Sequence, residues 1–367
     1  MSPAFLPKMR WWVAPTALLA LSVLSVIAIF MLRPQLGRAG TGATGAMNAV
    51  TWSADCGGRQ ANNFGCFEKH YQTLVATRGV AAAFIDIKDA YNRSAFVKGN
   101  CHQLVHIIGR AAGMKYGDVS TAYEQGDNFC WSGYYHGVME SVMAQIGYDQ
   151  IKPKINTICA TVSRAQKYSF YHYNCVHGLG HGIMAVNNSE LYDSLHTCDA
   201  LTDPWERESC YGGVFMENIM DEINPNHTTR YLKKDDLMYP CDAVNTQYKQ
   251  QCYLMQTSHA LQDTGYDFDK VFGLCDNVET DFRQTCYQSL GRDASGSTIS
   301  DPARTRDLCL KGRDFDARNN CLIGAVKDFI SYYHSSDQGM KLCTVLDDTR
   351  LRESCTATAK SYDVGTK

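Results

Sequence analysis

The stretch DKVFGLCDNVETDFRQTCYQSLGRD, residues 269–293, decides the fold, because it contains two helical segments joined by a turn. Apolar residues recur there at helical spacing, first at Val271, Leu274 and Val278 and then at Phe282, Cys286 and Leu290. Glu279, Thr280 and Asp281 form the predicted turn, and Thr280 or Asp281 can cap the second helix. This hairpin brings Cys275 next to Cys286, and a disulfide that closes so short a loop contributes roughly 2–3 kcal/mol.

The cysteines repeat this unit along the chain. The second cysteine of each later pair recurs after 34, 35 and 34 residues, at Cys252, Cys286, Cys321 and Cys355. A period near 34 residues is typical of two-helix repeats that stack into a solenoid. The sequence therefore predicts an all-α fold of disulfide-stapled helical-hairpin repeats, α-solenoid-like, after one N-terminal transmembrane helix.

The number and spacing of the cysteines also indicate the redox compartment. There are 16 cysteines, widely spaced and without a CxxC motif, which favours disulfides in an oxidising compartment over zinc sites built from cysteine. Pairing each cysteine with its neighbour leaves no thiol over, although sequence alone does not prove connectivity. The predicted pairs are Cys56/Cys66, Cys101/Cys130, Cys159/Cys175, Cys198/Cys210, Cys241/Cys252, Cys275/Cys286, Cys309/Cys321 and Cys343/Cys355.

The hairpin design and its period resemble those of disulfide-stapled Sel1-like and tetratricopeptide-type solenoids over about residues 150–367. The Trp, Gly and Ala pattern of tetratricopeptide repeats is absent from this chain. The resemblance therefore implies a fold and no particular function.

The N-terminus provides a route out of the cytoplasm. Residues 11–32 form a run of 22 residues without a charge, which is long enough to span a bilayer. Trp11 and Trp12 would lie at the membrane interface, where indoles are enriched. The alternative is a cleaved signal peptide, whose apolar core is usually shorter, about 7–15 residues. Because the disulfides need an oxidising compartment, we expect the C-terminal part in the periplasm or in an extracellular or lumenal space.

These observations divide the chain into five predicted parts. In order they are a cytoplasmic tail (1–10), a transmembrane signal anchor (11–32), a flexible linker (33–50), a His-rich helical domain with a candidate metal site (51–220) and C-terminal disulfide-linked hairpin repeats (221–367). The membrane is thus one expected partner, and a protein or peptide on the repeat surface is another. The net charge of −3 gives no reason to expect a nucleic acid.

Histidines concentrate in the His-rich domain, where six of the 11 fall between residues 102 and 181. His102 and His106 are four residues apart, and so are His177 and His181. His136 stands four residues before Glu140. Side chains four residues apart on a helix share a face, so each pair can chelate one ion.

The cysteine register brings these pairs together. His136 and His181 each lie six residues after the second cysteine of a pair, Cys130 or Cys175. Equivalent positions of successive repeats stack along one face, so we expect His136 and His181 to be neighbours, with the α-helix that follows Cys101 alongside. In later repeats the matched positions hold Met216, Ser258, Arg292 and Lys327. The histidines therefore indicate a local site and not a packing rule of every repeat.

The sequence predicts a transition-metal site from this set. The predicted ligands are His102, His106, His136, His177, His181 and Glu140. Imidazole suits copper, zinc and iron, and Glu140 can be a ligand, a partner of a ligand or a catalytic general base. The alternative is that the histidines are structural and bond to backbone carbonyls or to tyrosines such as Tyr134 and Tyr135.

Glycines recur in the same region. Gly133, Gly178 and Gly213 each lie three residues after a cysteine, although glycine weakens a helix by about 1 kcal/mol relative to alanine. They indicate the close approach of a neighbouring helix or of a ligand.

Three functions stay open at this point. The first is a membrane-anchored extracytoplasmic metalloprotein, a hypothesis that includes a metalloenzyme of the oxidoreductase or hydrolase class. The second is a helical-repeat interaction module with structural histidines, and the third is a metal carrier or sensor without turnover. The sequence has no HExxH motif of metalloproteases and no CxxCH motif for haem attachment.

Overall fold

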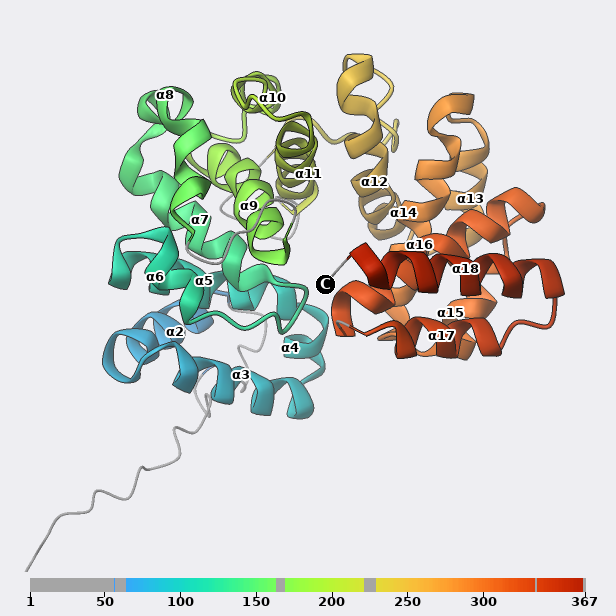
Figure 1. Ribbon diagram of the computed structural model, residues 1–367, viewed down its shortest axis with the longest axis horizontal. Helices are drawn as coiled ribbons and strands as arrows, with labels where there is room; N and C mark the ends of the chain where they lie inside the picture. The colour runs from blue at the N-terminus through green and yellow to red at the C-terminus, as the bar shows by residue number, and fades with distance from the viewer. Residues whose placement is uncertain (1–55, 57–63, 163–168, 221–228, 334, 366–367) are drawn as a thin grey trace, which may run out of the picture. The chain divides into compact units, whose positions relative to one another are not determined.

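The computed structural model describes residue 56 and residues 64–162, 169–220, 229–333 and 335–365. Throughout this part the regular structure is helical and no strand occurs, which confirms the all-α prediction for the described residues (Figure 1). The predicted tail, membrane span and linker lie outside the described residues. None of the described helices is both long and apolar enough to cross a membrane.

Helices of two lengths alternate along most of the described chain. Three helices come first: α2 (Phe64–Arg78), α3 (Val80–Arg93) and α4 (Ala95–Gly99). The long helices that follow are α5 (Cys101–Tyr116), α7 (Gly133–Ile146), α9 (Phe170–Val186), α11 (Pro204–Met220), α12 (Thr246–Asp263), α14 (Thr280–Thr298), α16 (Phe315–Tyr333) and α18 (Thr349–Gly365). Between them lie the short helices α6 (Val119–Glu124), α8 (Tyr148–Ile158), η1 (Cys159–Thr161), α10 (Leu191–Cys198), α13 (Phe268–Asp276), α15 (Pro302–Cys309) and α17 (Ser336–Thr344).

Disulfides join the short helices to the long ones. In the later hairpins a cysteine at the end of the short helix bonds to one in the first turns of the next long helix, as in Cys198–Cys210 and Cys309–Cys321. All eight predicted pairs are bonded, with Cα–Cα distances of 5.3–5.8 Å. The predicted connectivity is therefore confirmed.

The hairpin at residues 269–293 shows how local chemistry fixes its ends. Asp267 caps α13, because its side chain accepts a hydrogen bond from the backbone N–H of Lys270. The second helix, α14, begins at Thr280, so the predicted cap at Thr280 or Asp281 is wrong: both residues lie inside the first turn. Beside the disulfide, the hydroxyl of Tyr287 donates to Asp276 at 2.6 Å and adds a second link between the helices.

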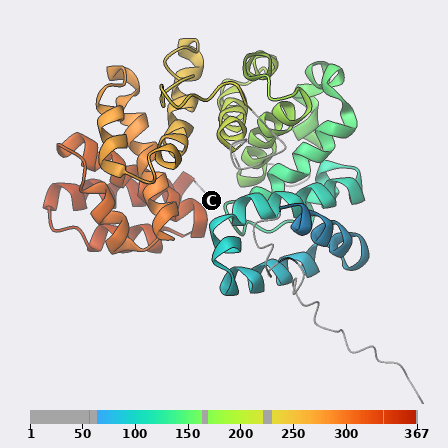
Figure 2. The ribbon, with the colours of Figure 1, turned by 180° about the vertical axis from the view of Figure 1, so that it is seen from behind.

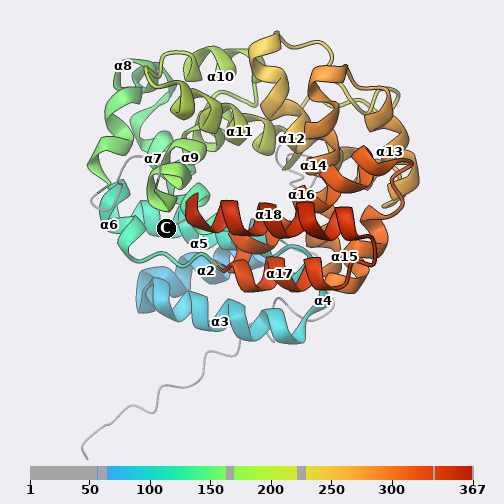
Figure 3. The same cartoon turned by 45° about the vertical axis from the view of Figure 1, so that its right-hand side comes forward.

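The long helices pack in chain order. Each of them contacts the next, from α5 to α7 and α9 and onward to α16 and α18 (Figure 3). The same order is visible from behind (Figure 2). Helices α11 and α12 also pack directly on each other across the predicted boundary at residue 220. The contacts group Thr51–Lys367 as one compact unit.

Glycines allow three pairs of long helices to cross at backbone distance. A Cβ on Gly137 of α7 would overlap the carbonyl oxygen of His106 in α5, and a Cβ on Gly213 of α11 would overlap that of His177 in α9. Gly324 of α16 meets the carbonyl of Gln288 in α14 in the same way. At these crossings the glycines make room for a neighbouring helix. This is one of the two explanations that the sequence left open, the other being the close approach of a ligand.

The described unit also makes a contact between residues far apart in the sequence. The ring of Trp131, just before α7, lies 4.5 Å from the ring of Tyr332 in α16. Trp131 stands between Cys130 and Ser132, and all three have positive φ angles of 54–61°. Three such residues in a row are unusual for non-glycine residues, so this turn is held by its surroundings.

Candidate metal centre

Five histidines from three consecutive long helices meet in one cluster. The ring of His136 in α7 lies 5.3 Å from the rings of both histidines of α5, His102 and His106. It lies 5.0 Å from the ring of His177 and 4.5 Å from that of His181, both in α9. The prediction that His136 and His181 are neighbours is therefore confirmed.

The helix crossings explain why these rings meet deep in the protein. Gly137 follows His136 directly and brings the backbone of α7 against the carbonyl of His106. The exposed fraction is 4% for His106, 3% for His136 and 0% for His181, whereas His102 is partly exposed. Burial of a ring nitrogen costs free energy unless the nitrogen has a partner.

The first histidine pair has its Nδ1 atoms bound to acceptors. Nδ1 of His102 donates to the carbonyl oxygen of Cys130 at 2.9 Å, and Nδ1 of His106 donates to Oε1 of Glu140 at 2.5 Å. Because a carbonyl and a carboxylate only accept, both Nδ1 atoms carry the proton. In the neutral form of both rings the two Nε2 atoms bear lone pairs, and they face each other at 3.2 Å.

The second pair repeats this arrangement. Nδ1 of His177 donates to the carbonyl oxygen of Ser209 at 3.2 Å, and Nδ1 of His181 donates to Oε2 of Glu217 at 2.6 Å. The Nε2 atoms of His177 and His181 again face each other, at 3.3 Å. Each pair thus combines one carbonyl acceptor, one carboxylate acceptor and two opposed lone pairs.

Burial keeps four of these imidazoles neutral, those of His102, His136, His177 and His181. Burial lowers the pKa of His102 to about 3 and that of His177 to about 4. Burial also lowers the pKa of His136 and of His181 well below the usual value of histidine. At neutral pH these rings are therefore in the form that binds a metal ion.

The carboxylate of Glu140 binds both His106 and the guanidinium group of Arg110. Burial acts to raise the pKa of its carboxyl group, but the neighbouring His106 and Arg110 outweigh burial and leave this pKa far below its usual range. Oε1 accepts from His106, and Oε2 accepts from Nη1 of Arg110 at 2.8 Å. Glu140 is thus placed as the acceptor that orients His106, and its predicted roles as metal ligand and catalytic base stay predictions.

The donor atoms have the spacing of a metal site. Within the described residues, three groups have donor atoms that all lie within 4.8 Å of one another, so these buried groups could hold a metal ion. The groups are His102/His106/His136, His136/His177/His181 and Glu140/His181/Glu217. All predicted ligands occur in them, and Glu217 is added.

One edge of the cluster reaches the surface. The ring of Tyr173 lies 5.2 Å from that of His177, at 23° to it, and the Tyr173 side chain is 40% exposed. The ring nitrogen Nδ1 of His136 is buried and has no hydrogen-bond partner in the part of the chain that the structure describes.

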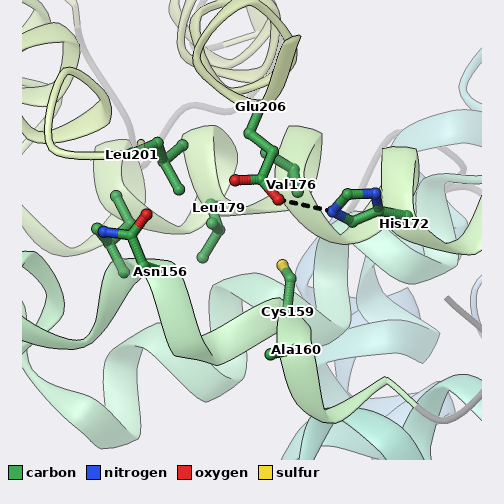
Figure 4. A pocket seen from close by; sticks show the side chains of 9 residues that line it. Asn156, Cys159, Ala160, His172, Val176, Leu179, Leu201 and Glu206 are labelled. Carbon is green, nitrogen blue, oxygen red and sulfur yellow. Dashed lines mark hydrogen bonds and ion pairs between the residues drawn. The ribbon is translucent and has the colours of Figure 1, made fainter. Parts of the chain in front are cut away.

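The sixth histidine of the region lies elsewhere. Nε2 of His172 is 2.8 Å from Oε1 of Glu206, and both residues line a cavity of about 120 Å³ beside Cys159 and Leu201 (Figure 4). His172 belongs to none of the three donor groups.

From the sequence, Glu217 can extend the site, because it lies one residue after Met216, the position matched to His136 and His181. Sequence reasoning missed the backbone acceptors of the two pairs, the carbonyls of Cys130 and Ser209. A backbone acceptor leaves no trace in the identity of its residue.

In the described residues, fold and site together define a disulfide-stapled helical unit with a buried histidine–glutamate cluster formed by α5, α7, α9 and α11. Comparison with known proteins adds no relative: no protein-family model matches the chain, and neither a curated protein nor a solved structure matches it.

Proposed function

We propose that this protein is a metalloprotein that binds transition-metal ions through the histidines of α5, α7 and α9. The observation that carries the proposal is the pair of opposed lone pairs, at 3.2 Å between His102 and His106 and at 3.3 Å between His177 and His181. Two lone pairs at that distance repel each other unless a cation lies between them. That cation is either a proton or a metal ion.

The surroundings favour the metal ion over the proton. A shared proton would put a positive charge on rings in the protein interior, where burial already lowers the pKa of His102 and His177. A metal ion instead gains two coordinate bonds. Its ligands are oriented by Glu140 and Glu217 through the far ring nitrogen, which is the usual way in which proteins fix and strengthen a ligating histidine.

The donors restrict the choice of metal. All described cysteines are in disulfides, so no thiolate is present among them. Neutral imidazole suits zinc, copper and iron. Two nitrogens bound to one tetrahedral ion at about 2.0–2.1 Å lie about 3.3–3.4 Å apart, close to the observed separations, which suits zinc or copper best.

The protein works outside the cytoplasm in this proposal, held to a membrane by residues 11–32. The eight disulfides support an oxidising compartment, and the uncharged run of residues 11–32 supports the anchor. A protein or peptide partner for the repeat surface stays a prediction from the sequence.

Metal analysis tests the proposal. The full-length chain, purified in detergent without a polyhistidine tag and under non-reducing conditions, is expected to retain zinc or copper or to take it up on reconstitution. His106→Ala and His181→Ala should each lower the bound metal, whereas His196→Ala, an exposed residue of α10, should not. Less than about 0.2 equivalents of any transition metal after reconstitution would refute the metal site.

A further inference from the structure

The cluster does not form a single set of donors. In the described residues, His102 and His106 share a donor group with His136, and His177 and His181 share another with His136, but no group joins members of both pairs. His136 is the one histidine common to the two groups. The number of ions in the cluster therefore depends on whether these two donor groups bind one ion together or one ion each.

Distances decide whether one ion can serve both pairs. Nitrogens bound to the same ion at about 2.0–2.1 Å lie about 3.3–3.4 Å apart in a tetrahedron and at most about 4.2 Å apart across an octahedron. The separations within the two pairs, 3.2 and 3.3 Å, meet the tetrahedral value. No group of described donors that lie within 4.8 Å of one another combines the two pairs, so the donors divide into two triads that meet at His136.

We propose that the cluster binds two transition-metal ions, one at the Nε2 atoms of His102 and His106 and the other at those of His177 and His181, with the ring of His136 bridging them. This inference rests on the proposed function and adds the number of ions and the role of His136. The ring of His136 has two nitrogens, one for each ion. Its Nδ1 atom is buried and has no other hydrogen-bond partner among the described residues, which leaves it available for coordination.

The proposed bridge has a definite proton balance. A neutral imidazole carries one N–H proton, so binding of the second ion to His136 releases that proton to solvent and leaves an imidazolate between two cations. In their neutral form the other four rings bind through Nε2 and keep the proton on Nδ1, so no further proton leaves on binding.

The bridge also leaves each ion with room for an outside ligand. Each ion would have three imidazole donors, which is the protein ligand number of catalytic zinc sites, and a fourth position for water or a small anion. Exposed surface lies next to each pair, at the partly exposed His102 and at Tyr173 beside His177. Small solvent-borne ligands are thus the chemical class that this centre would take.

Stoichiometry separates the outcomes. The full-length chain is loaded with zinc alone, desalted and measured for metal per chain. Two ions per chain support the inference, one ion overturns it but leaves the proposed function standing, and none overturns the proposed function itself.

Pairwise removal makes the test independent of the absolute count. The double variant His102→Ala/His106→Ala should retain one ion per chain, and so should His177→Ala/His181→Ala. If either double variant loses all metal while its disulfides and thermal unfolding stay like those of the wild type, the two-ion division is wrong. His172→Ala, outside the cluster, is the matched control and should keep two ions.

Copper loading tests the bridge. Two Cu²⁺ ions joined by an imidazolate are magnetically coupled, so the electron paramagnetic resonance signal of the wild type should integrate to well below two spins per chain. His136→Ala, or His136→Gln if the alanine variant does not fold, should lose the coupling and show one isolated spin for each ion that stays bound. A wild-type signal of two isolated spins would rule out the bridge.

Discussion

Two helix crossings in this molecule have the same backbone arrangement but differ in the chemistry of their side chains. Gly180 and Gly213 place α9 and α11 in backbone contact, and Gly291 and Gly324, each 111 residues later, do the same for α14 and α16. At the first crossing the carbonyl of His177 meets Gly213, and at the second that of Gln288 meets Gly324. The crossing itself therefore requires no histidine.

The side chains at matched positions make the difference. His181 corresponds to Arg292, and Glu217 corresponds to Asp328. His181 donates to Glu217 at 2.6 Å and so presents Nε2 to His177. Asp328 instead keeps Oδ2 buried without a hydrogen-bond partner among the described residues, and burial raises its pKa to about 6. The same backbone arrangement thus holds a candidate metal-binding pair in one place and a buried carboxyl group in the other.

The largest expected effect tests the backbone contact that the two helix crossings have in common. Gly213→Ala and Gly324→Ala each force a Cβ into a carbonyl oxygen of the facing helix. Because backbone cannot move aside as a side chain does, we expect each to lower the free energy of unfolding by about 3 kcal/mol. Chemical unfolding followed by circular dichroism measures this loss.

Metal binding then separates the two glycines. Gly213→Ala should also weaken metal binding, because it displaces the backbone of His177, whereas folded Gly324→Ala should bind metal like the wild type. Equal loss of metal in the two variants would mean that the crossings are coupled and that the comparison between them fails.

The next effect concerns the carboxylates. Glu217→Gln keeps the shape of the side chain but removes the charge that Nδ1 of His181 contacts. Loss of such a partner typically weakens metal affinity by about 10–100-fold. Competition with a chromophoric chelator measures the change. Asp328→Asn, at the matched position, should leave the affinity unchanged, and a similar loss there would contradict a local role for Glu217.

The sequence predicted the disulfide connectivity better than the hydrogen bonds of the site. Cysteine spacing was sufficient for the disulfides, because a bond between Cys275 and Cys286 needs only a short turn between two helices. The same register predicted that His136 and His181 meet. It could not predict the carbonyl of Cys130 as an acceptor, since this depends on three consecutive residues with positive φ before α7.

A third effect is a pH dependence located at the second crossing. The pKa of Asp328 is raised to about 6, so the folded protein holds this proton more tightly than the unfolded chain. The stability contributed by protonated Asp328 is fully present below about pH 4 and is lost as the pH rises through about 6. Asp328→Asn should therefore match the wild type near pH 4 and be more stable by about 2–3 kcal/mol above pH 7.

Thermal unfolding of the metal-free proteins at a series of pH values measures this difference. Metal-free samples are needed because bound metal adds its own pH dependence through the histidines. A constant difference between variant and wild type at every pH would show that the change comes from packing and not from the ionisation of Asp328.

The smallest effect sharpens the comparison within one helix. Gly291 and Gly296 both lie in α14, but a Cβ on Gly296 meets nothing within 4 Å, whereas one on Gly291 overlaps the carbonyl oxygen of Cys321. Gly296→Ala should raise the free energy of unfolding by about 0.4–1 kcal/mol, because alanine loses less backbone entropy on folding. Gly291→Ala should lower it, as Gly324→Ala does. Opposite signs for two glycines five residues apart would show that helix contact, and not helix propensity, explains the glycines of the crossings.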